Sequence, residues 1–310
     1  MFKKLFFLLI FFISINNMNG QKVTYFSDND ENFAEVIVND DLIFTCRVAG
    51  LKNSGPYVVL LHGFPETSRM WKRLIEDLSK KNFRVIAPDQ RGYSKGARPK
   101  KVKDYSIDHL TNDVIEVANS FNIDKFHLVG HDWGAAVGWS VSKLFKKRIL
   151  SYSALSVPHI DAFSDAIIND KVQRKKSYYI GLFRIRLLPE LYFTFSNYRN
   201  LKSLWTSSSN DEVFDYMSVF SQKNAIKSAL NWYRATSLKK TKKLGEIEVP
   251  TLLIYGENDM AIGSKAVDET KKFVSAPYKL KKIKSSHWLI QDSYEIVSQE
   301  ILNHFEKYND

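Results

Sequence analysis

The sequence predicts an α/β fold with a mostly parallel central sheet, helices on both faces and an inserted helical cap domain. Apolar segments of about four to eight residues alternate with helical segments of about 11 to 15, the pattern of parallel strands joined by right-handed crossovers. This alternation stops near residue 160 and resumes near residue 245. The 310 residues are 44% hydrophobic and 14% aromatic, which is enough apolar material for a large core.

The first half of the core begins with a hairpin and continues as alternating strands and helices. Two β-rich segments, 33–38 and 42–48, are separated by Asn39-Asp40-Asp41, which is a turn composition. The alternation then predicts strands at 57–61, 84–87, 126–129 and 149–157 and helices at 68–80, 107–121 and 135–145.

The middle of the chain, residues 160–244, carries no strand signal and is rich in aromatic residues with helical spacing. Helices are expected at 176–195 and 224–238. The sheet pattern returns with strands at 251–255 and 279–283 and helices at 264–273 and 293–307. We therefore expect residues 21–159 and 245–310 to form the core, and residues 160–244 to form a cap over the carboxyl ends of the strands, where such sheets bind ligands.

The N-terminus predicts export. Lys3 and Lys4 precede an unbroken apolar run at 5–15, and Gly20 stands before Gln21, as in a signal peptide spanning residues 1–20. The run is shorter than the roughly 20 residues of a membrane span, so no stable span is expected after cleavage. An uncleaved anchor is the alternative, because Met18 is a poor residue at its distance from the cut. The mature protein would be periplasmic or secreted.

Composition excludes several classes of function. The formal charge is +11, but the lysines lie in short groups without interleaved aromatic residues, so no nucleic-acid partner is expected. These groups are interpreted as solvated faces, with loose attraction to anionic surfaces as the alternative. Cys46 is the only cysteine, which rules out an intramolecular disulfide. No metal-ligand spacing or phosphate-binding glycine loop occurs, so no metal and no cofactor is expected. The sequence carries no signal for an oligomeric state.

The strongest chemical signal is Gly130-His131-Asp132-Trp133-Gly134, between a predicted strand and a predicted helix. Small residues on either side of a central residue permit the tight strand-turn-helix elbow that exposes a nucleophile at the sheet edge. The central residue here is Asp132. An aspartate that merely caps the helix is the alternative interpretation.

A charge-relay pair is predicted at the same edge of the sheet. Asp259 follows the strand at 251–255, and His287 follows the last strand, so nucleophile, acid and histidine run in the chain order of this architecture. Glu257 is the alternative acid. No chemical role is expected for His131, which directly precedes the nucleophile.

The loop at 62–66 completes the predicted site. Such a loop supplies one oxyanion-hole amide and the residue after the nucleophile supplies the other, which nominates the backbone N–H groups of Phe64 and Trp133. A carboxylate with an ordinary pKa near 3.9 is anionic at pH 7 and can attack saturated carbon without a base. The resulting ester would be opened by water that His287 deprotonates, with Asp259 fixing the imidazole tautomer.

Five motifs resemble the epoxide hydrolase family of α/β-hydrolases, in particular soluble epoxide hydrolases: residues 62–66, 89–93, 130–135, 231–234 and 286–288. The resemblance runs over residues 53–305 and includes the cap. It implies hydrolysis of an epoxide to a vicinal diol.

The same resemblance implies two cap tyrosines that donate protons to the epoxide oxygen. One matches Tyr233, and the other is Tyr179, which aligns better than Tyr178. The expected partners are an apolar epoxide and water, in a pocket with Phe64, Trp133 and Trp288.

Two other functions remain open at this point. A dehalogenase shares the aspartate nucleophile, but haloalkane dehalogenases typically carry asparagine at the position of Phe64. Fluoroacetate dehalogenases carry arginines at the positions of Trp133 and Ala136, which this chain lacks. A catalytically silent binding protein on the same fold is the second alternative. An ordinary esterase is disfavoured because the elbow has no serine, threonine or cysteine at its centre.

Overall fold

A computed structural model of the chain describes residues 13–16, 22–38, 42–236 and 243–309. Ten strands form one sheet in the order β1-β2-β3-β4-β6-β5-β7-β8-β9-β10. The strands from β5 to β10 pair in parallel, whereas β1 to β4 are antiparallel to their neighbours. Their bounds are β1 Ile13–Asn16, β2 Lys22–Asp28, β3 Glu31–Val38, β4 Leu42–Ala49, β5 Tyr57–Leu61, β6 Arg84–Pro88, β7 Phe126–His131, β8 Ile149–Leu155, β9 Thr251–Gly256 and β10 Tyr278–Ile283.

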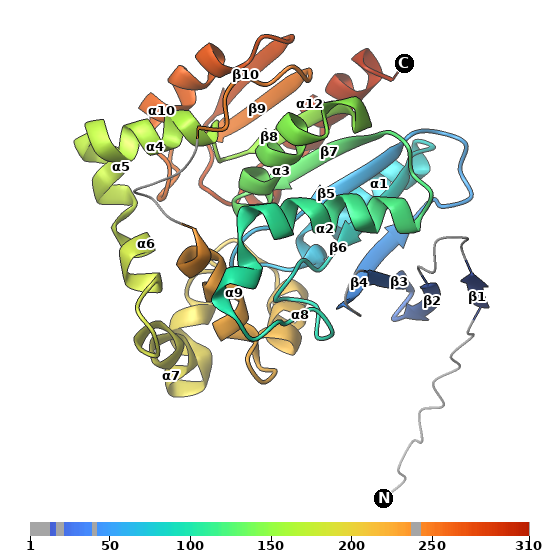
Figure 1. Cartoon of the computed structure of the whole chain (residues 1–310), viewed down its shortest axis with the longest axis horizontal. Helices are drawn as coiled ribbons and strands as arrows, with labels where there is room; N and C mark the ends of the chain where they lie inside the picture. The colour runs from blue at the N-terminus through green and yellow to red at the C-terminus, as the bar shows by residue number, and fades with distance from the viewer. Residues whose placement is uncertain (1–12, 17–21, 39–41, 237–242, 310) are drawn as a thin grey trace, which may run out of the picture.

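Helices cover both faces of the sheet. In Figure 1, α2 and α3 lie in front of the strands, and α1 and α12 lie behind them. The central strand β7 is buried at every position, as expected for a parallel strand with helices on both sides. The core helices are α1 Lys72–Lys80, α2 Ile107–Ser120, α3 Trp133–Leu144, α10 Ser264–Glu269, α11 Leu289–Asp292 and α12 Tyr294–Lys307, with single 3-10 turns at Ser68–Trp71, Val102–Tyr105, Lys146–Arg148 and Thr270–Phe273.

The predicted fold class is confirmed, and the predicted core strands and helices are present within a few residues. Strand β2 was missed, because Val23 is the only buried residue among those of β2 whose side chains are described, and the strand ends in the polar residues Ser27 and Asp28. Of the predicted signal peptide, the structure describes only Ile13–Asn16, as β1; its other residues lie outside the described part of the chain. Cys46 is buried in β4 with a free thiol.

The inserted segment is helical and lies beside the carboxyl ends of the strands (Figure 1). The single helix expected at 176–195 is wrong. The chain there forms three helices with a break at Ser177 and another before Leu188, where Leu187 has a φ of 70°. The helical spacing of apolar residues continues across Ser177, so it did not reveal the first break. The second had a signal in Pro189, because a proline is tolerated in the first turn of a helix but not in its interior. The helices are α4 Ile160–Asn169, α5 Lys171–Lys176, α6 Tyr178–Phe183, α7 Leu188–Lys202, α8 Asn210–Phe220 and α9 Ala225–Ala235.

Buried polar contacts fasten the cap to the core. Asp215 of α8 forms an ion pair with Arg47 of β4 and accepts a hydrogen bond from the hydroxyl of Thr67 (2.8 Å). The indole N–H of Trp232 in α9 donates to the carbonyl of Arg91 (2.8 Å). These contacts fix the position of the cap helices relative to the carboxyl ends of the strands. No helix among the described residues is long and apolar enough to cross a membrane.

Candidate active site

Asp132 occupies the turn between β7 and α3, with a φ of 51° and a ψ of −120°. An L-residue adopts this conformation only where its surroundings hold it there, as at functional sites. A Cβ added to Gly134 would lie 2.1 Å from the carbonyl oxygen of Leu61, and one added to Gly63 would lie 2.3 Å from Cβ of Asp132. Both glycines are therefore required for the close approach of the two loops. The aspartate side chain does not cap α3.

The three residues expected to form a triad come together. Nε2 of His287 lies 3.5 Å from Oδ2 of Asp132, and its Nδ1 lies 2.7 Å from Oδ2 of Asp259. The other oxygen of Asp259 accepts the backbone N–H groups of Ala261 (2.7 Å) and Ile262 (2.9 Å). Asp259 is thus fixed on both oxygens, with one of them aimed at the imidazole. Glu257, the alternative acid, is exposed, and the carboxylates that contact His287 are those of Asp132 and Asp259.

The charges at this site perturb each other. Burial alone would lower the pKa of His287, but the carboxylates of Asp259 and Asp132 outweigh it and raise that pKa well above its ordinary value. Burial alone would raise the pKa of Asp132. His287, together with the N–H of Phe64, outweighs it, so the pKa of Asp132 is lowered. The resting site therefore holds an ionised nucleophile beside a protonated histidine.

One of the two expected oxyanion donors already contacts the nucleophile. The N–H of Phe64 donates to Oδ1 of Asp132 (2.8 Å). Trp133 begins α3, where the first amides have no partner within the helix. Within the described chain its N–H makes no hydrogen bond. That amide is therefore available to a negative charge that develops on the side chain of Asp132.

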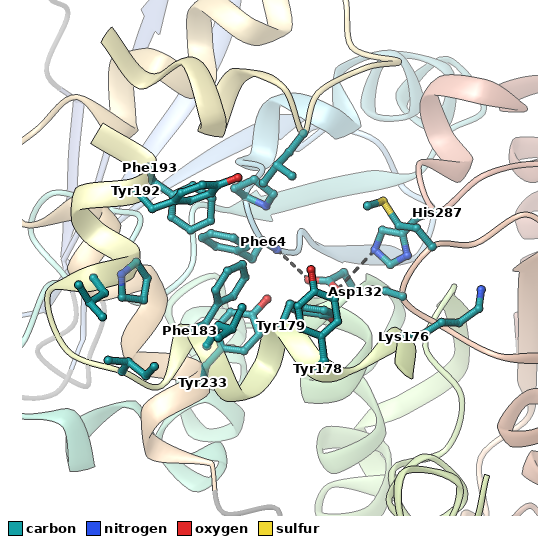
Figure 2. A pocket seen from close by; sticks show the side chains of 18 of the residues that line it. Phe64, Asp132, Lys176, Tyr178, Tyr179, Phe183, Tyr192, Phe193, Tyr233 and His287 are labelled. Carbon is teal, nitrogen blue, oxygen red and sulfur yellow. Dashed lines mark hydrogen bonds and ion pairs between the residues drawn. The ribbon is translucent and has the colours of Figure 1, made fainter. Parts of the chain in front are cut away.

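A cavity of about 450 Å³ opens above Asp132, between the core and the cap (Figure 2). Its lining is mostly apolar and aromatic, as in small-molecule sites. The residues that line it are Phe64, Pro65, Asp132, Lys176, Tyr178, Tyr179, Leu182, Phe183, Ile185, Leu188, Pro189, Tyr192, Phe193, Leu204, Tyr233, Met260, Ala261, His287 and Trp288.

A second cavity, of about 100 Å³, also reaches Asp132 and is lined in part by Trp133. Phe64 and Trp288 therefore lie in the main cavity, and Trp133 lies in the smaller one. The nucleophile is one of three residues that line both cavities, together with Tyr179 and Tyr233.

Two phenols face the nucleophile from the cap. Tyr179 of α6 and Tyr233 of α9 line both cavities, and their rings lie 6.3 Å apart. Figure 2 shows both beside Asp132. Burial, reinforced by the charge of Asp132, raises the pKa of each phenol, which keeps both protonated. Tyr178, the other candidate, is 69% exposed at the edge of the cavity.

Comparison with known proteins gives a consistent answer. A family model described as the alpha/beta hydrolase fold matches residues 56–294. Human epoxide hydrolase 4 is 31% identical over 266 residues, which cover 82% of this chain and 73% of that protein. The chain belongs to the α/β-hydrolase family, in its epoxide hydrolase branch.

Two further proteins are similar to this hydrolase. The AB hydrolase superfamily protein YfhM of Bacillus subtilis is 32% identical over 274 residues, which cover 86% of this chain and 96% of that protein. Among solved structures, a Bacillus megaterium epoxide hydrolase variant with its diol product bound has a TM-score of 0.77. It covers 91% of this chain and 99% of its own at 23% identity, a likeness of fold.

The structure of the hydrolase also contains a buried pair that sequence reasoning missed. Nε2 of His131 lies 2.9 Å from the carbonyl oxygen of His287, and its Nδ1 lies 3.1 Å from Oε2 of Glu66. A carbonyl oxygen only accepts, so Nε2 carries the proton of this hydrogen bond. The hydroxyl of Ser156 donates to the same carbonyl (3.0 Å). The two hydrogen bonds to its carbonyl oxygen fix the backbone of His287. Among the described residues, no group of three or more histidine, cysteine, aspartate or glutamate side chains could hold a metal ion.

Proposed function

We propose that this hydrolase converts apolar epoxides to vicinal diols through a covalent ester on Asp132. The observation that carries the proposal is the placement of a buried, ionised carboxylate opposite two protonated phenols, Tyr179 and Tyr233, in one apolar cavity. A carboxylate attacks carbon directly, and an epoxide is a substrate whose leaving oxygen stays attached and needs a proton. The site offers both groups on opposite walls.

In the first step, Oδ2 of Asp132 is the attacking oxygen, because Oδ1 is held by the N–H of Phe64. A bond forms between Oδ2 and an epoxide carbon while the ring C–O bond breaks. The ring oxygen takes a proton from Tyr179 or Tyr233 and becomes a hydroxyl. General acid catalysis of this kind contributes roughly 10²- to 10⁴-fold.

Ester formation removes the charge of Asp132 that helps to raise the pKa of His287, so the imidazolium returns a proton to the phenolate left by the first step. In the second step, water attacks Cγ of the ester and gives a proton to the neutral Nε2 of His287. The charge that develops on Oδ1 faces the N–H of Phe64 and the free N–H of Trp133, each contributing about 3–4 kcal/mol in comparable sites. The bond between Cγ and Oδ2 then breaks, and Oδ2 leaves on the diol with the proton from His287. The remaining proton of the water passes from the new carboxyl group of Asp132 to His287, which restores the resting ion pair, and the oxygen of the water stays on Asp132.

The test is turnover of the purified chain on aryl and alkyl epoxides, beside bromoalkanes and a nitrophenyl ester, with Asp132→Asn as the control variant. The parent protein is expected to form diol from the epoxides, and Asp132→Asn is expected to form none. A single turnover in ¹⁸O-water should label Asp132 and not the diol. Halide release without diol would instead identify a dehalogenase, and inactivity toward every compound would favour a binding protein.

We also propose that the protein is exported, with cleavage before Gln21. The basic pair Lys3 and Lys4 and the apolar run at 5–15 are the support for it. Expression of the chain with a C-terminal tag, followed by mass measurement of the secreted or periplasmic product, tests this. A product that retains its first residues and sediments with membranes would indicate an uncleaved anchor.

A further inference from the structure

The helices around the mouth of the main cavity expose an unusual number of apolar side chains. Of the fourteen large hydrophobic side chains that are exposed among the described residues, nine lie between residues 171 and 202, in α5, α6, α7 and the segment that joins α6 to α7. We call this segment the cap rim. Apolar patches of this kind mark interaction surfaces. Its exposed members are Val172, Tyr178, Leu182, Ile185, Leu187, Leu188, Leu191, Tyr192 and Phe195.

The cap rim encloses the entrance to the active site. Five of its exposed side chains also line the main cavity: Tyr178, Leu182, Ile185, Leu188 and Tyr192. A residue that lines a cavity and is also exposed stands at its opening. The three helices follow one another along one margin of the molecule (Figure 1), and Figure 2 shows Tyr178 and Tyr192 among the side chains that line the cavity.

The same segment is strongly basic. It contains eight lysines and arginines against one acidic residue, Glu190, a net charge of +7 within 32 residues, compared with +11 for the whole chain. Glu190 is already paired with Arg234. Within the described part of the chain, none of the eight cations forms an ion pair: Lys171, Arg174, Lys175, Lys176, Arg184, Arg186, Arg199 and Lys202.

A second basic surface adjoins the first. A groove of about 830 Å³ runs beside the start of α7 and is lined by Arg186 and Leu187 of the cap rim. Its remaining wall carries Lys100, Lys101, Lys223 and Lys227. Leu187 belongs to the groove and its neighbour Leu188 to the cavity mouth, so the positive charge continues outward from the apolar entrance.

We propose that the cap rim docks onto the surface of an anionic lipid bilayer, so that the cavity mouth faces the membrane. Exposed leucine and aromatic side chains flanked by lysines and arginines are the composition of interfacial membrane-binding elements. Three of these cations, Arg174, Lys176 and Arg184, donate to backbone carbonyls, and none is neutralised by a carboxylate of the described residues. The unpaired cations favour anionic lipid headgroups over a second copy of this chain, whose identical rim would carry the same positive charge. An apolar epoxide dissolved in the membrane would then enter the cavity without crossing water.

The purpose of docking, substrate capture, rests on the proposed function, but docking itself is measured without turnover. The direct probe is an environment-sensitive dye on the full chain with Leu187→Cys, beside the same dye on Ile296→Cys in α12. Cys46 is fully buried, so labelling goes to the introduced thiol. Vesicles of phosphatidylcholine with about one quarter phosphatidylserine should shift the dye at position 187 to the blue, and leave the dye at 296 unchanged.

Variants of the apolar part of the rim are compared by vesicle co-sedimentation. Leu187→Ser/Leu191→Ser should weaken binding at least about fivefold, while the matched pair Leu144→Ser/Ile296→Ser should bind as the parent does. All four side chains are about half exposed or more, and none lines the main cavity. Turnover of a water-soluble epoxide should therefore be unchanged in both pairs. All variants share the same N-terminus, so any contribution from that segment cancels.

The charged part of the rim is tested in the same way. Lys175→Gln/Arg199→Gln should weaken binding to anionic vesicles about tenfold. Added salt should also weaken the binding of the parent protein to these vesicles. The control pair Lys147→Gln/Lys307→Gln carries the same change of charge and should have no such effect.

Three results would overturn the proposal. The first is an unshifted dye at position 187 in the presence of vesicles. The second is equal binding to neutral and anionic vesicles by all the variants. The third is a dye at 187 that is already shifted without vesicles in a protein of doubled mass, which would assign the rim to contact between two copies. If the parent protein binds anionic vesicles as expected but hydrolyses no epoxide, the proposed function is refuted and the docking proposal is not.

Discussion

Replacing Asp259 with asparagine should stop the reaction at the ester. Oδ1 of Asp259 accepts two backbone N–H groups, those of Ala261 and Ile262. In the variant, the amide oxygen must keep these two donors, so its NH₂ group turns toward Nδ1 of His287. Nδ1 must then accept, and the imidazole proton moves to Nε2. That is the atom that has to take a proton from water.

The size of the effect follows from two contributions. The bond between His287 and Asp259, at 2.7 Å and buried, is a charge-assisted hydrogen bond worth about 1.5–3 kcal/mol. At 1.36 kcal/mol for each factor of ten, its loss corresponds to roughly 10- to 150-fold in rate. The wrong tautomer adds to this, and the same substitution in a serine protease triad costs about 10⁴-fold. We expect turnover to fall by about 10³- to 10⁴-fold.

The assay separates the two chemical steps. Ester formation uses Asp132 and the cap phenols, so it should continue in Asp259→Asn, and intact mass measurement after mixing with an epoxide should find the ester as the main species. Glu257→Gln is the matched control, because it makes the same change on an exposed carboxylate two residues away. The reasoning is refuted if Asp259→Asn turns over within about threefold of the parent, or if it loses activity without accumulating ester.

Three further predictions follow from the same geometry. Tyr233→Phe should lower kcat/KM on epoxides by about 10²-fold or more, whereas Tyr178→Phe should change it less than threefold; equal effects in a kinetic assay would contradict the assignment. The ion pair of Asp132 with His287 should stabilise the fold fully below the ordinary histidine pKa of about 6.5 and lose this effect as pH rises through the raised pKa of His287. The melting temperature of the parent should therefore exceed that of Asp132→Asn most at mildly acidic pH, and a difference that grows with pH would contradict it. Asp215→Asn should lower the free energy of unfolding by about 1–3 kcal/mol in urea titrations, and an unchanged midpoint would mean that the cap is held elsewhere.

The core and the elbow could be predicted because their signals are local. Strands of β-branched residues, the small residues at 130 and 134 and the chain order of Asp259 and His287 each follow from backbone geometry at one place. The break at Ser177 could not be predicted in the same way. It depends on how α5 and α6 pack around the cavity, while the helical period continues across Ser177 without a gap.

The pair of His131 and Glu66 was missed for a different reason. The two residues are 65 positions apart, and each lies inside a motif already explained by a neighbour, Asp132 in one case and Phe64 in the other. Only the fold shows that both side chains are fully buried and meet behind His287. The available signal was chemical: two ionisable residues occur beside the two oxyanion donors, and buried ionisable groups require partners.

The division of the site between core and cap makes the contact between them part of the catalytic geometry. The nucleophile belongs to the core, but the proton donor Tyr233 belongs to α9. Its neighbour Trp232 donates to the carbonyl of Arg91, and the guanidinium of Arg91 is itself held by both carboxylate oxygens of Asp113 (2.6 Å each).

Gly92, which follows Arg91 in the same loop, allows α9 to pack closely against the core. Gly92 has a φ of 93°, and a Cβ there would lie 3.1 Å from the backbone of Ser228. The motif at 89–93, known at first only as a point of resemblance, therefore has a physical role. The loop fixes the position of the Tyr233 phenol relative to the carboxylate of Asp132. A substitution that displaces this loop would therefore slow ring opening without removing any reacting group.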